Sequence, residues 1–371
     1  CRVTTLQCTA LSDGSINEYQ FPDRSALECL QGAPTAQYPQ SRMSHSSKTD
    51  HQLRQNAAET AQRLAGRPRP NMVSLHKQPR VSFELFPPAT PAGWAGFVDT
   101  VDQLDHLDGA FMSVTYGAGG TSQERTLRAL EAMTACCTTP VAGHLTCAGS
   151  NRAEVMTVVD AYAAAGVKHI VALRGDPPRD SSAFQPHPDG FPSAAHLVSA
   201  IAQRGSFDIS VAAYPEVHPE AASLADDLDN LKRKIDAGAR RAITQFFFEP
   251  DTFLRFRDQA AAAGIHVPII PGILPVVNLK RTIEMASTCA THVPPWLTSL
   301  FDGLDDAPEI RALISATVTA ELCTRLQDQG VDRFHFYTLN RPELAWAICR
   351  MLGLRSTSSH SGYIQTSVAS A

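Results

Sequence analysis

Eight short apolar segments recur along the chain from residue 81 onward, and this repetition constrains the fold more than any other feature. Most of them are almost continuously apolar, which is typical of strands covered on both faces. They follow one another at intervals of roughly thirty residues, the length of one strand-and-helix unit. We therefore predict strands at 81–86, 111–116, 140–146, 169–175, 209–214, 241–248, 268–274 and 333–339.

Longer stretches with helical spacing separate these strands. One of them opens on Asn151, a residue that favours the first position before a helix, and ends at Gly166. Alternating strands and helices of this number and size predict a (β/α)8 TIM barrel over residues 76–355. The predicted helices are 93–107, 122–136, 151–165, 219–237, 250–263 and 342–352, with two more inside 278–328.

An open, doubly wound α/β sheet is the structural alternative. Such sheets commonly bind dinucleotides through a G-x-G-x-x-G turn after the first strand, or phosphates through a Walker A loop. Neither pattern occurs at the matching place in this chain. The barrel is therefore the preferred interpretation.

The two ends of the chain differ from the middle in composition. Residues 1–75 lack a sustained period and are rich in Ser, Gln, Pro and charged residues, so we expect a disordered extension with one short helix at 51–65. Residues 356–371 are rich in Ser and Thr and are expected to form a flexible tail.

Charge and cysteine usage narrow the class of protein. The net charge of −5 argues against nucleic acid or an anionic membrane as a partner. No apolar run reaches the length of a membrane span. The nine cysteines show no metal-binding spacing, so we expect reduced thiols, no metal site and a cytoplasmic protein.

Polar residues stand at the predicted strand ends, where TIM barrels carry their active sites. Glu84 lies in the first strand between large apolar residues, and apolar surroundings favour the neutral acid that a proton donor needs. The alternative is a structural carboxylate paired with an arginine. The other strand-end candidates are Thr115, His144, Arg174, Asp176, Tyr214, Glu216, His218, Gln245, Asn340 and Arg341.

Several of these candidates have an ordinary structural explanation as well. Arg174 and Asp176 could form a surface ion pair, although Gly175 between them permits a ligand to approach the backbone. His144 could be a core histidine with satisfied hydrogen bonds. On the helix after the fifth strand, Asp227, Asn230 and Lys234 share one face with Arg233 at its edge; this face could be solvated or could reach a phosphate or ribose.

Nine collinear motifs between residues 81 and 353 resemble the catalytic barrel of bacterial 5,10-methylenetetrahydrofolate reductases. Each motif alone is modest, but a chance match of all nine is not credible. They are FELFPP (83–88), SVTYGA (113–118), HLTC (144–147), HIVALRGD (169–176), AYPEVHP (213–219), NLKRK (230–234), ITQFFF (243–248), PGILP (271–275) and FYTLNR (336–341).

The resemblance implies an FAD-dependent enzyme that reduces 5,10-methylenetetrahydrofolate to 5-methyltetrahydrofolate. NADH or NADPH would supply the hydride in ping-pong order, and the product would supply methyl groups for methionine synthesis. The implied partners are the folate and the nicotinamide dinucleotide, and the implied assembly is a homo-oligomer.

The resemblance also assigns roles to residues. Glu84 would be the general acid, and Asp176 would lie near the flavin and the pterin. Thr115, Gln245 and Arg341 would contact substrate. The residues implied for FAD are Thr115, Tyr116, Ala118, Gly119, His144, Arg174, Gly175, Asp176, Ala194, Tyr214, His218, Asp227, Asn230, Arg233 and Lys234.

One departure from the family pattern follows the seventh strand. The family carries an aromatic residue there, and counting without gaps places Met285 at that position, with Arg281 one turn earlier. Arg281 therefore joins the candidate substrate contacts.

Two other functions remain as hypotheses. A barrel enzyme of different chemistry, such as a metal-dependent lyase or a methyltransferase, would need a metal cluster or another cofactor site. A catalytically inactive folate- or flavin-binding protein would be expected to lack the acid, yet Glu84 is present.

Overall fold

The computed structural model describes residues 78–117, 123–176, 184–205 and 207–355. The predicted extension with its helix, the predicted tail, and the candidates Ala118 and Gly119 lie outside these ranges.

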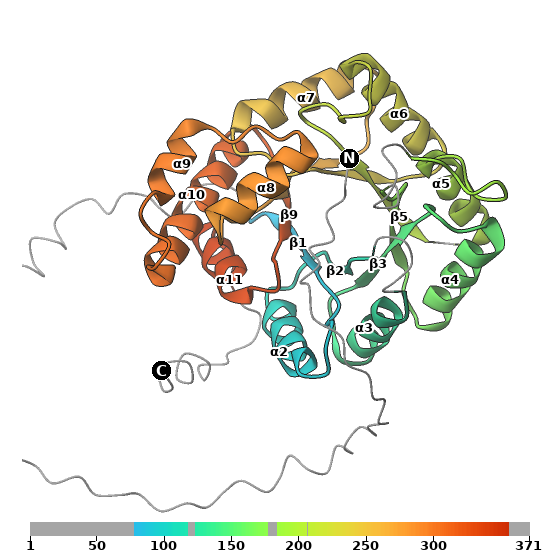
Figure 1. The fold of residues 1–371 in the computed structure, drawn as a ribbon, viewed down its shortest axis with the longest axis horizontal. Helices are drawn as coiled ribbons and strands as arrows, with labels where there is room; N and C mark the ends of the chain where they lie inside the picture. The colour runs from blue at the N-terminus through green and yellow to red at the C-terminus, as the bar shows by residue number, and fades with distance from the viewer. Residues whose placement is uncertain (1–77, 118–122, 177–183, 206, 356–371) are drawn as a thin grey trace, which may run out of the picture. The chain divides into compact units, whose positions relative to one another are not determined.

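A single parallel sheet forms the centre of the described chain, as the (β/α)8 prediction requires (Figure 1). Its strand order is β7-β6-β5-β4-β3-β2-β1-β9-β8, so the chain runs around a nearly closed ring with the helices outside it. The strands are β1 (Arg80–Leu85), β2 (Phe111–Val114), β3 (Val141–Thr146), β4 (His169–Leu173), β5 (Asp208–Ala213), β6 (Arg241–Thr244), β7 (Ile269–Ile270), β8 (Gly272–Ile273) and β9 (Arg333–Tyr337).

The seventh predicted strand is divided in two at Pro271. Proline has no backbone N–H to donate, so the ladder is interrupted there. On one side β7 pairs with β6, and on the other β8 pairs with β9. The carbonyl of Pro271 still accepts a hydrogen bond from the His335 N–H at 3.0 Å. The nine observed strands thus correspond to the eight predicted ones, and this divided strand brings the two ends of the ring together.

Gly272 is required by this closure, and we expect Gly272→Ala to lower the free energy of unfolding by about 3 kcal/mol through overpacking. A Cβ at this position would lie 2.0 Å from the Thr244 carbonyl oxygen and 2.7 Å from a ring carbon of Tyr337. Urea denaturation of both variants measures the effect. Gly96→Ala is the matched control, because a Cβ there meets nothing within 4 Å. Equal stability of the two variants would contradict this account of the closure.

The helices agree with the prediction except in three places. A helix, α5, lies between β4 and β5 where none was predicted, although Leu197, Val198 and Ile201 give it a buried apolar face. Residues 278–328 hold three helices instead of two. The helix predicted from residue 219 begins later, because Ser223 accepts a hydrogen bond from the Asp226 N–H and caps it. The helices are α2 (Gly93–Asp105), α3 (Gln123–Cys136), α4 (Arg152–Ala164), α5 (Ala194–Arg204), α6 (Leu224–Asp236), α7 (Pro250–Ala262), α8 (Leu279–Cys289), α9 (Pro295–Phe301), α10 (Pro308–Asp328) and α11 (Pro342–Met351).

Side chains alternate between the two faces of each strand, and this alternation decides which of them face the barrel interior. On β1, Val81, Phe83 and Leu85 belong to the main apolar core, whereas Ser82 and Glu84 line cavities inside the barrel. A small apolar cluster, which includes Phe111, Val171 and Ile243, fills part of the interior. The barrel interior therefore combines a polar layer at each end with apolar residues between them.

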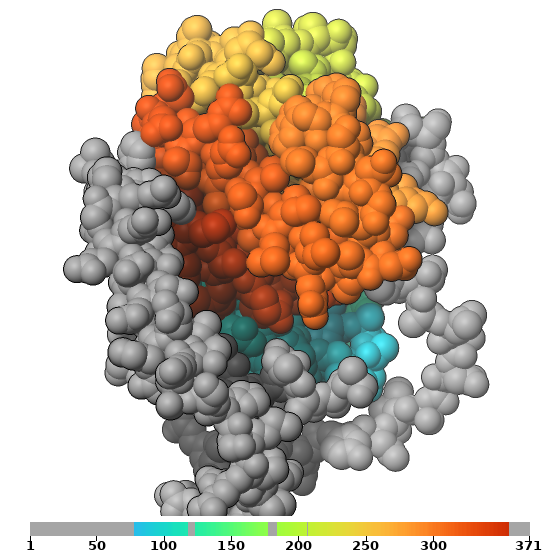
Figure 2. Space-filling model, turned by 90° about the vertical axis from the view of Figure 1, so that its left-hand side faces the viewer, coloured from blue at the N-terminus to red at the C-terminus, as the bar shows by residue number. Residues whose placement is uncertain are grey.

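The face shown in Figure 2 is formed largely by α8, α9 and α10, in orange. The helices α9 and α10 carry exposed apolar side chains, among them Trp296, Leu300 and Leu313, the last with 71% of its surface exposed. Even so, within the described ranges no helix combines the length and the apolar character needed to cross a membrane.

Candidate active site

Two neighbouring cavities occupy the C-terminal end of the barrel. The smaller has a volume of about 80 Å³ and is lined by Glu84, His144, Gln245, His335 and Tyr337 among others. The larger has a volume of about 550 Å³ and lies over β4, β5 and α6. They meet at the side chains that line both of them, which are Leu173, Ala212 and Tyr214.

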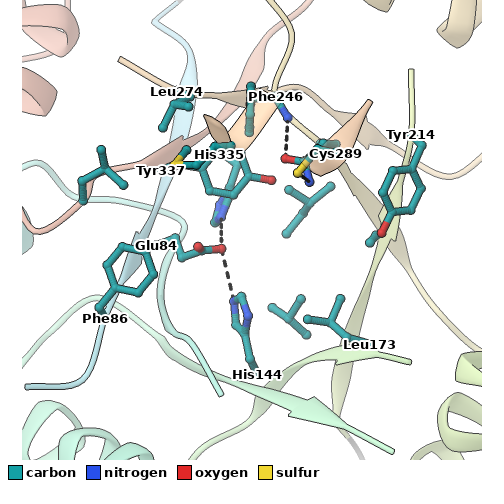
Figure 3. Close-up of a pocket in the computed structure, with 16 residues that line it drawn as sticks. Glu84, Phe86, His144, Leu173, Tyr214, Phe246, Leu274, Cys289, His335 and Tyr337 are labelled. Carbon is teal, nitrogen blue, oxygen red and sulfur yellow. Dashed lines mark hydrogen bonds and ion pairs between the residues drawn. The ribbon is translucent and has the colours of Figure 1, made fainter. Parts of the chain in front are cut away.

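Glu84 lies between two imidazole rings in the smaller cavity (Figure 3). Its Oε2 is 3.5 Å from Nε2 of His144 and 3.7 Å from Nε2 of His335, and 13% of the Glu84 side chain is exposed. The apolar residues that flank it in sequence do not surround the carboxylate, since Phe83 and Leu85 point to the opposite face of the strand. The described residues also place no arginine against it, so the structural ion pair considered as an alternative is not formed there. Glu84 is an almost buried acid with imidazole neighbours at the mouth of a barrel.

His144 is held neutral in this setting. Burial lowers the pKa of its imidazole from 6.5 to about 4, and the nearby Glu84 carboxylate opposes the shift only in part. Its Nε2 contacts the Ser113 hydroxyl at 3.2 Å. Its Nδ1 is buried and has no hydrogen-bond partner among the described residues. The orphaned nitrogen is available to a ligand.

Neutral, buried His144 predicts loss of stability in acid. An imidazole whose pKa is 6.5 in the unfolded chain and about 4 in the folded protein binds its proton more tightly after unfolding. The corresponding stability is complete above pH 6.5 and is lost as the pH falls to about 4, a total of about 3 kcal/mol. Urea denaturation at pH 7.5 and 4.5 should show this extra loss in the wild type and not in His144→Gln. The same pH dependence in both proteins would rule out His144 as the cause of this loss of stability.

Gln245 and Asp176 reach the site from two other strands. Gln245 follows β6 and lines the smaller cavity; its amide donates to Sγ of Cys289 at 3.3 Å and accepts from the Phe246 N–H at 3.0 Å. Asp176 lies three residues beyond the end of β4 and is half-buried. Burial is the largest cause that raises the pKa of Tyr214, and the charge of Asp176 is one of the smaller ones; Asp176 itself lines neither cavity. The structure thus brings Glu84, Gln245 and Asp176 to the same end of the barrel.

The larger cavity has a buried cation in its wall. Lys234 is 4% exposed, and its ammonium group donates to the Ala212 carbonyl at 2.6 Å. Burial lowers the pKa of Lys234 to about 8, while the Asp227 carboxylate favours the charged form. Asp227 in turn accepts a hydrogen bond from the His218 N–H at 2.9 Å. The face of α6 that carries Asp227 and Lys234 is therefore buried, and it is not a solvated helix face.

The remaining candidates differ in their relation to this cavity, since Arg233 lines it whereas Thr115 and Tyr116 line neither cavity. Arg233 lines the cavity edge while pairing with Asp229 on its exposed side. Thr115 is buried after β2, and its hydroxyl has no partner among the described residues. Burial raises the pKa of Tyr116, the next residue, to about 12. The candidate residues that line the larger cavity are Arg174, Gly175, Ala194, Tyr214, His218, Asp227, Asn230, Arg233 and Lys234.

Glu220 was missed by the sequence analysis. Its carboxylate forms a two-point ion pair with the Arg174 guanidinium, at 2.6 and 3.0 Å, and the Phe184 ring lies 4.6 Å from the same guanidinium. The pairing of Arg174 with Asp176 that we considered is thus replaced by a pair with a residue from the next strand-end loop. The sequence did hold a signal, because Glu220 directly follows the AYPEVHP motif and is two residues from His218. In the structure its N–H donates a hydrogen bond to the His218 ring.

His335 and Ser113 were missed for a different reason. Only strand ends were searched, whereas His335 lies in the middle of β9 and Ser113 in the middle of β2. The His335 side chain lines the smaller cavity, and the Ser113 hydroxyl contacts His144, which also lines it. The two-residue period from Tyr337 back to His335 would have found the second imidazole.

Seven of the described candidate residues line neither cavity: Thr115, Tyr116, Asp176, Glu216, Arg281, Asn340 and Arg341. Arg281 on α8 and Arg341 at the start of α11 are exposed and line neither cavity. Met285, the residue at the expected aromatic position, does line the smaller one. Asn340 has a structural role, since its amide exchanges two hydrogen bonds with the backbone of Phe86 at 2.9 and 3.0 Å. Within the parts of the chain that are described, no group of His, Cys, Asp and Glu side chains could hold a metal ion.

Comparison with known proteins identifies the family of this chain. The family model for methylenetetrahydrofolate reductase matches residues 71–353. The chain is 46% identical over 285 residues to the 5,10-methylenetetrahydrofolate reductase of Pectobacterium carotovorum subsp. carotovorum, which covers 77% of this chain and 94% of that protein. Identity to the Escherichia coli K12 protein of the same name is 45% with the same coverage. Methylenetetrahydrofolate reductase (NADH) 1 of Arabidopsis thaliana is 35% identical over 76% of this chain and 50% of its own length. The chain therefore belongs to the methylenetetrahydrofolate reductase family.

Proposed function

We propose that this protein reduces 5,10-methylenetetrahydrofolate to 5-methyltetrahydrofolate, with FAD as the bound cofactor and NADH or NADPH as the hydride source. One observation carries the proposal. An almost buried carboxyl group, Glu84, lies in a narrow cavity that shares three lining side chains with a wider cavity lined by cations. The names of the family members support the same reaction.

The residues of the larger cavity fit FAD. A dinucleotide needs cations for its diphosphate and polar partners for its ring system and ribose. Lys234, Arg233 and Arg174 supply the cations. Outside that lining, the Thr115 hydroxyl and Nδ1 of His144, whose ring lines the smaller cavity, are buried polar atoms without a partner among the described residues, and a ligand would satisfy them. We propose that FAD is held by Thr115, Tyr116, His144, Arg174, Gly175, Asp176, Ala194, Tyr214, His218, Asp227, Asn230, Arg233 and Lys234, with Ala118 and Gly119 from the segment outside the described residues.

When bound, FAD supplies the carrier that takes hydride from the nicotinamide and passes it to the folate, the two substrates using one site in turn. The protein then has to bind, orient and protonate. When the five-membered ring of the folate opens, one C–N bond breaks, and Glu84 protonates the nitrogen that is released. The proton comes from the carboxyl oxygen, and the resulting carboxylate is left facing the His144 and His335 imidazoles. The small volume of about 80 Å³ around it restricts water.

The remaining polar residues position the substrates. The Gln245 amide, fixed through Cys289 and the Phe246 N–H, is placed to contact both the folate and the nicotinamide. Asp176 is proposed to lie beside the pterin and the flavin, where a negative charge would affect both. Arg281, Arg341 and Thr115 complete the proposed substrate contacts; the first two are exposed, so they would act on parts of the substrate outside the cavities.

Reconstitution with FAD tests the proposal. The purified protein should show a flavin spectrum, or gain one on addition of FAD, at one FAD per chain. A protein that stays colourless after incubation with FAD would overturn the proposed function.

A further inference from the structure

A third cavity, of about 310 Å³, lies at the N-terminal end of the barrel, opposite to the candidate active site. Arg80, His169, Asp208, Arg241 and Arg333 line it, and each is the first residue of its strand. Nothing in the proposed reaction uses this end of the barrel.

The charges in this cavity are unequal. Four cations line it, Arg80, Lys168, Arg241 and Arg333, against the single carboxylate of Asp208. Arg241 forms an ion pair with that carboxylate, so these two charges compensate each other. The remaining three cations have no comparable carboxylate in the cavity.

The ionisable neighbour of Arg241 does not change this balance. Nε2 of His169 is 3.1 Å from Arg241 and 2.8 Å from the Ser210 hydroxyl. Burial first, and then the charge of Arg241, lower the pKa of His169 to about 3. His169 is therefore neutral in this cavity at physiological pH.

Arg80 and Arg333 stand directly opposite each other in the pairing of β1 with β9. Like charges at opposed positions of a sheet are unfavourable unless something compensates them. Arg333 has one carboxylate nearby, the largely exposed Asp332 at 3.7 Å. Among the residues that the structure describes, neither Arg80 nor Lys168 has a side-chain partner.

The floor of the cavity is apolar. Phe111, Ile270 and Phe334 line it, together with the hydroxyl-bearing Ser82. Arg80 and Lys168 are exposed, so dissolved salt would screen their attraction for a bound anion. Two guanidinium groups and one ammonium group on the lining of one cavity supply the charged donors that phosphate oxygens accept from.

We propose that this cavity is a binding site for a small phosphate-bearing anion, held by Arg80, Arg333 and Lys168. The site is separate from the cation-lined cavity beside α6, and the proposal is independent of the proposed reductase activity.

Isothermal titration calorimetry tests this site. Inorganic pyrophosphate is titrated into the full chain after saturation with FAD. Saturation with FAD fills the proposed diphosphate site near Lys234. We expect one pyrophosphate per chain, with an affinity that falls as salt is added. The double variant Arg80→Gln/Arg333→Gln should weaken binding at least tenfold. The matched control Arg240→Gln should stay within twofold, because Arg240 is adjacent to Arg241 but exposed and outside the cavity.

Further arms keep the test decisive. Lys168→Gln changes an exposed side chain, so it should weaken binding without affecting folding even if the double variant is poorly folded. Titration with ADP shows which kind of molecule carries the phosphate. Tighter binding of ADP than of pyrophosphate identifies a nucleotide, and weaker binding identifies an inorganic or smaller phosphate. Both results support the proposal. Absence of saturable pyrophosphate binding overturns the proposal. So does binding that persists in both variants, or binding that is lost in Lys234→Met instead.

Discussion

Replacing Glu84 by glutamine should abolish folate reduction and spare flavin reduction. In a stopped-flow experiment without oxygen, we expect reoxidation of the reduced protein by methylenetetrahydrofolate to slow by about 10²- to 10⁴-fold, the usual contribution of a general acid. Reduction of the same protein by NADH or NADPH should change by less than about threefold, because hydride transfer from a nicotinamide needs no proton from Glu84.

The substitution Glu84→Gln is nearly isosteric, so it separates proton donation from shape. The introduced amide would keep the size of the side chain beside His144 and His335 but could not supply an acidic proton. Glu216→Gln is the matched control. Glu216 is also a carboxylate near a strand end, but it accepts hydrogen bonds from the His292 N–H at 3.1 Å and does not line the Glu84 cavity. The control should leave both half-reactions close to wild type.

The two half-reactions also give the outcomes that would contradict this role. If Glu84→Gln slowed both equally, Glu84 would be positioning the cofactor or the barrel mouth and not delivering a proton. If the variant lost stability and neither rate changed per folded molecule, Glu84 would be a structural carboxylate.

Lys234→Met should weaken FAD binding by about 30- to 100-fold, the loss expected when a buried charge-assisted hydrogen bond to a phosphate is removed. Methionine keeps most of the volume of the lysine stem. Lys234 is the most deeply buried of the cations that line the larger cavity, so solvent would screen its attraction for a diphosphate least. Flavin fluorescence during titration of the apoprotein measures the dissociation constant.

Lys232→Met on the same helix controls for the loss of one positive charge. Lys232 is exposed and pairs with Asp236, at 2.8 Å, away from the cavity. Its removal should leave FAD affinity within about twofold. Because Lys234 also donates to the Ala212 carbonyl, the melting temperature of each apoprotein must be compared. Equal FAD affinity of the two variants would contradict the assignment of the larger cavity to the dinucleotide.

The barrel was predictable because its signal is local and repeated. Apolar strands at regular spacing and helix-ending glycines gave the (β/α)8 architecture, and the capping box at Asn151 and Glu154 is formed as expected for an N-cap residue. The division of the seventh strand at Pro271 was readable in principle, since a proline cannot donate to a ladder. The helix α5 was missed because its apolar face is short and the helix begins twenty-one residues after the end of β4.

The candidate site was predictable only in part, for physical reasons. Strand ends converge in a barrel, so Glu84, His144 and Gln245 could be expected to meet from their positions alone. The environment of Glu84 could not be predicted in the same way. The flanking Phe83 and Leu85 face away from its carboxylate. The imidazole of His335 comes from a strand about 250 residues later, and no local sequence pattern links residues so far apart. The pairing of Arg174 with Glu220 likewise depends on how two separate loops fold together.

Two half-reactions observed in sequence on the purified protein test the central claim most directly. With oxygen excluded, addition of NADH or NADPH should bleach the flavin absorbance, and subsequent addition of 5,10-methylenetetrahydrofolate should restore it with one 5-methyltetrahydrofolate formed per flavin. A flavin that is bleached by the nicotinamide but not restored by the folate, or a protein that binds no flavin, would contradict the account.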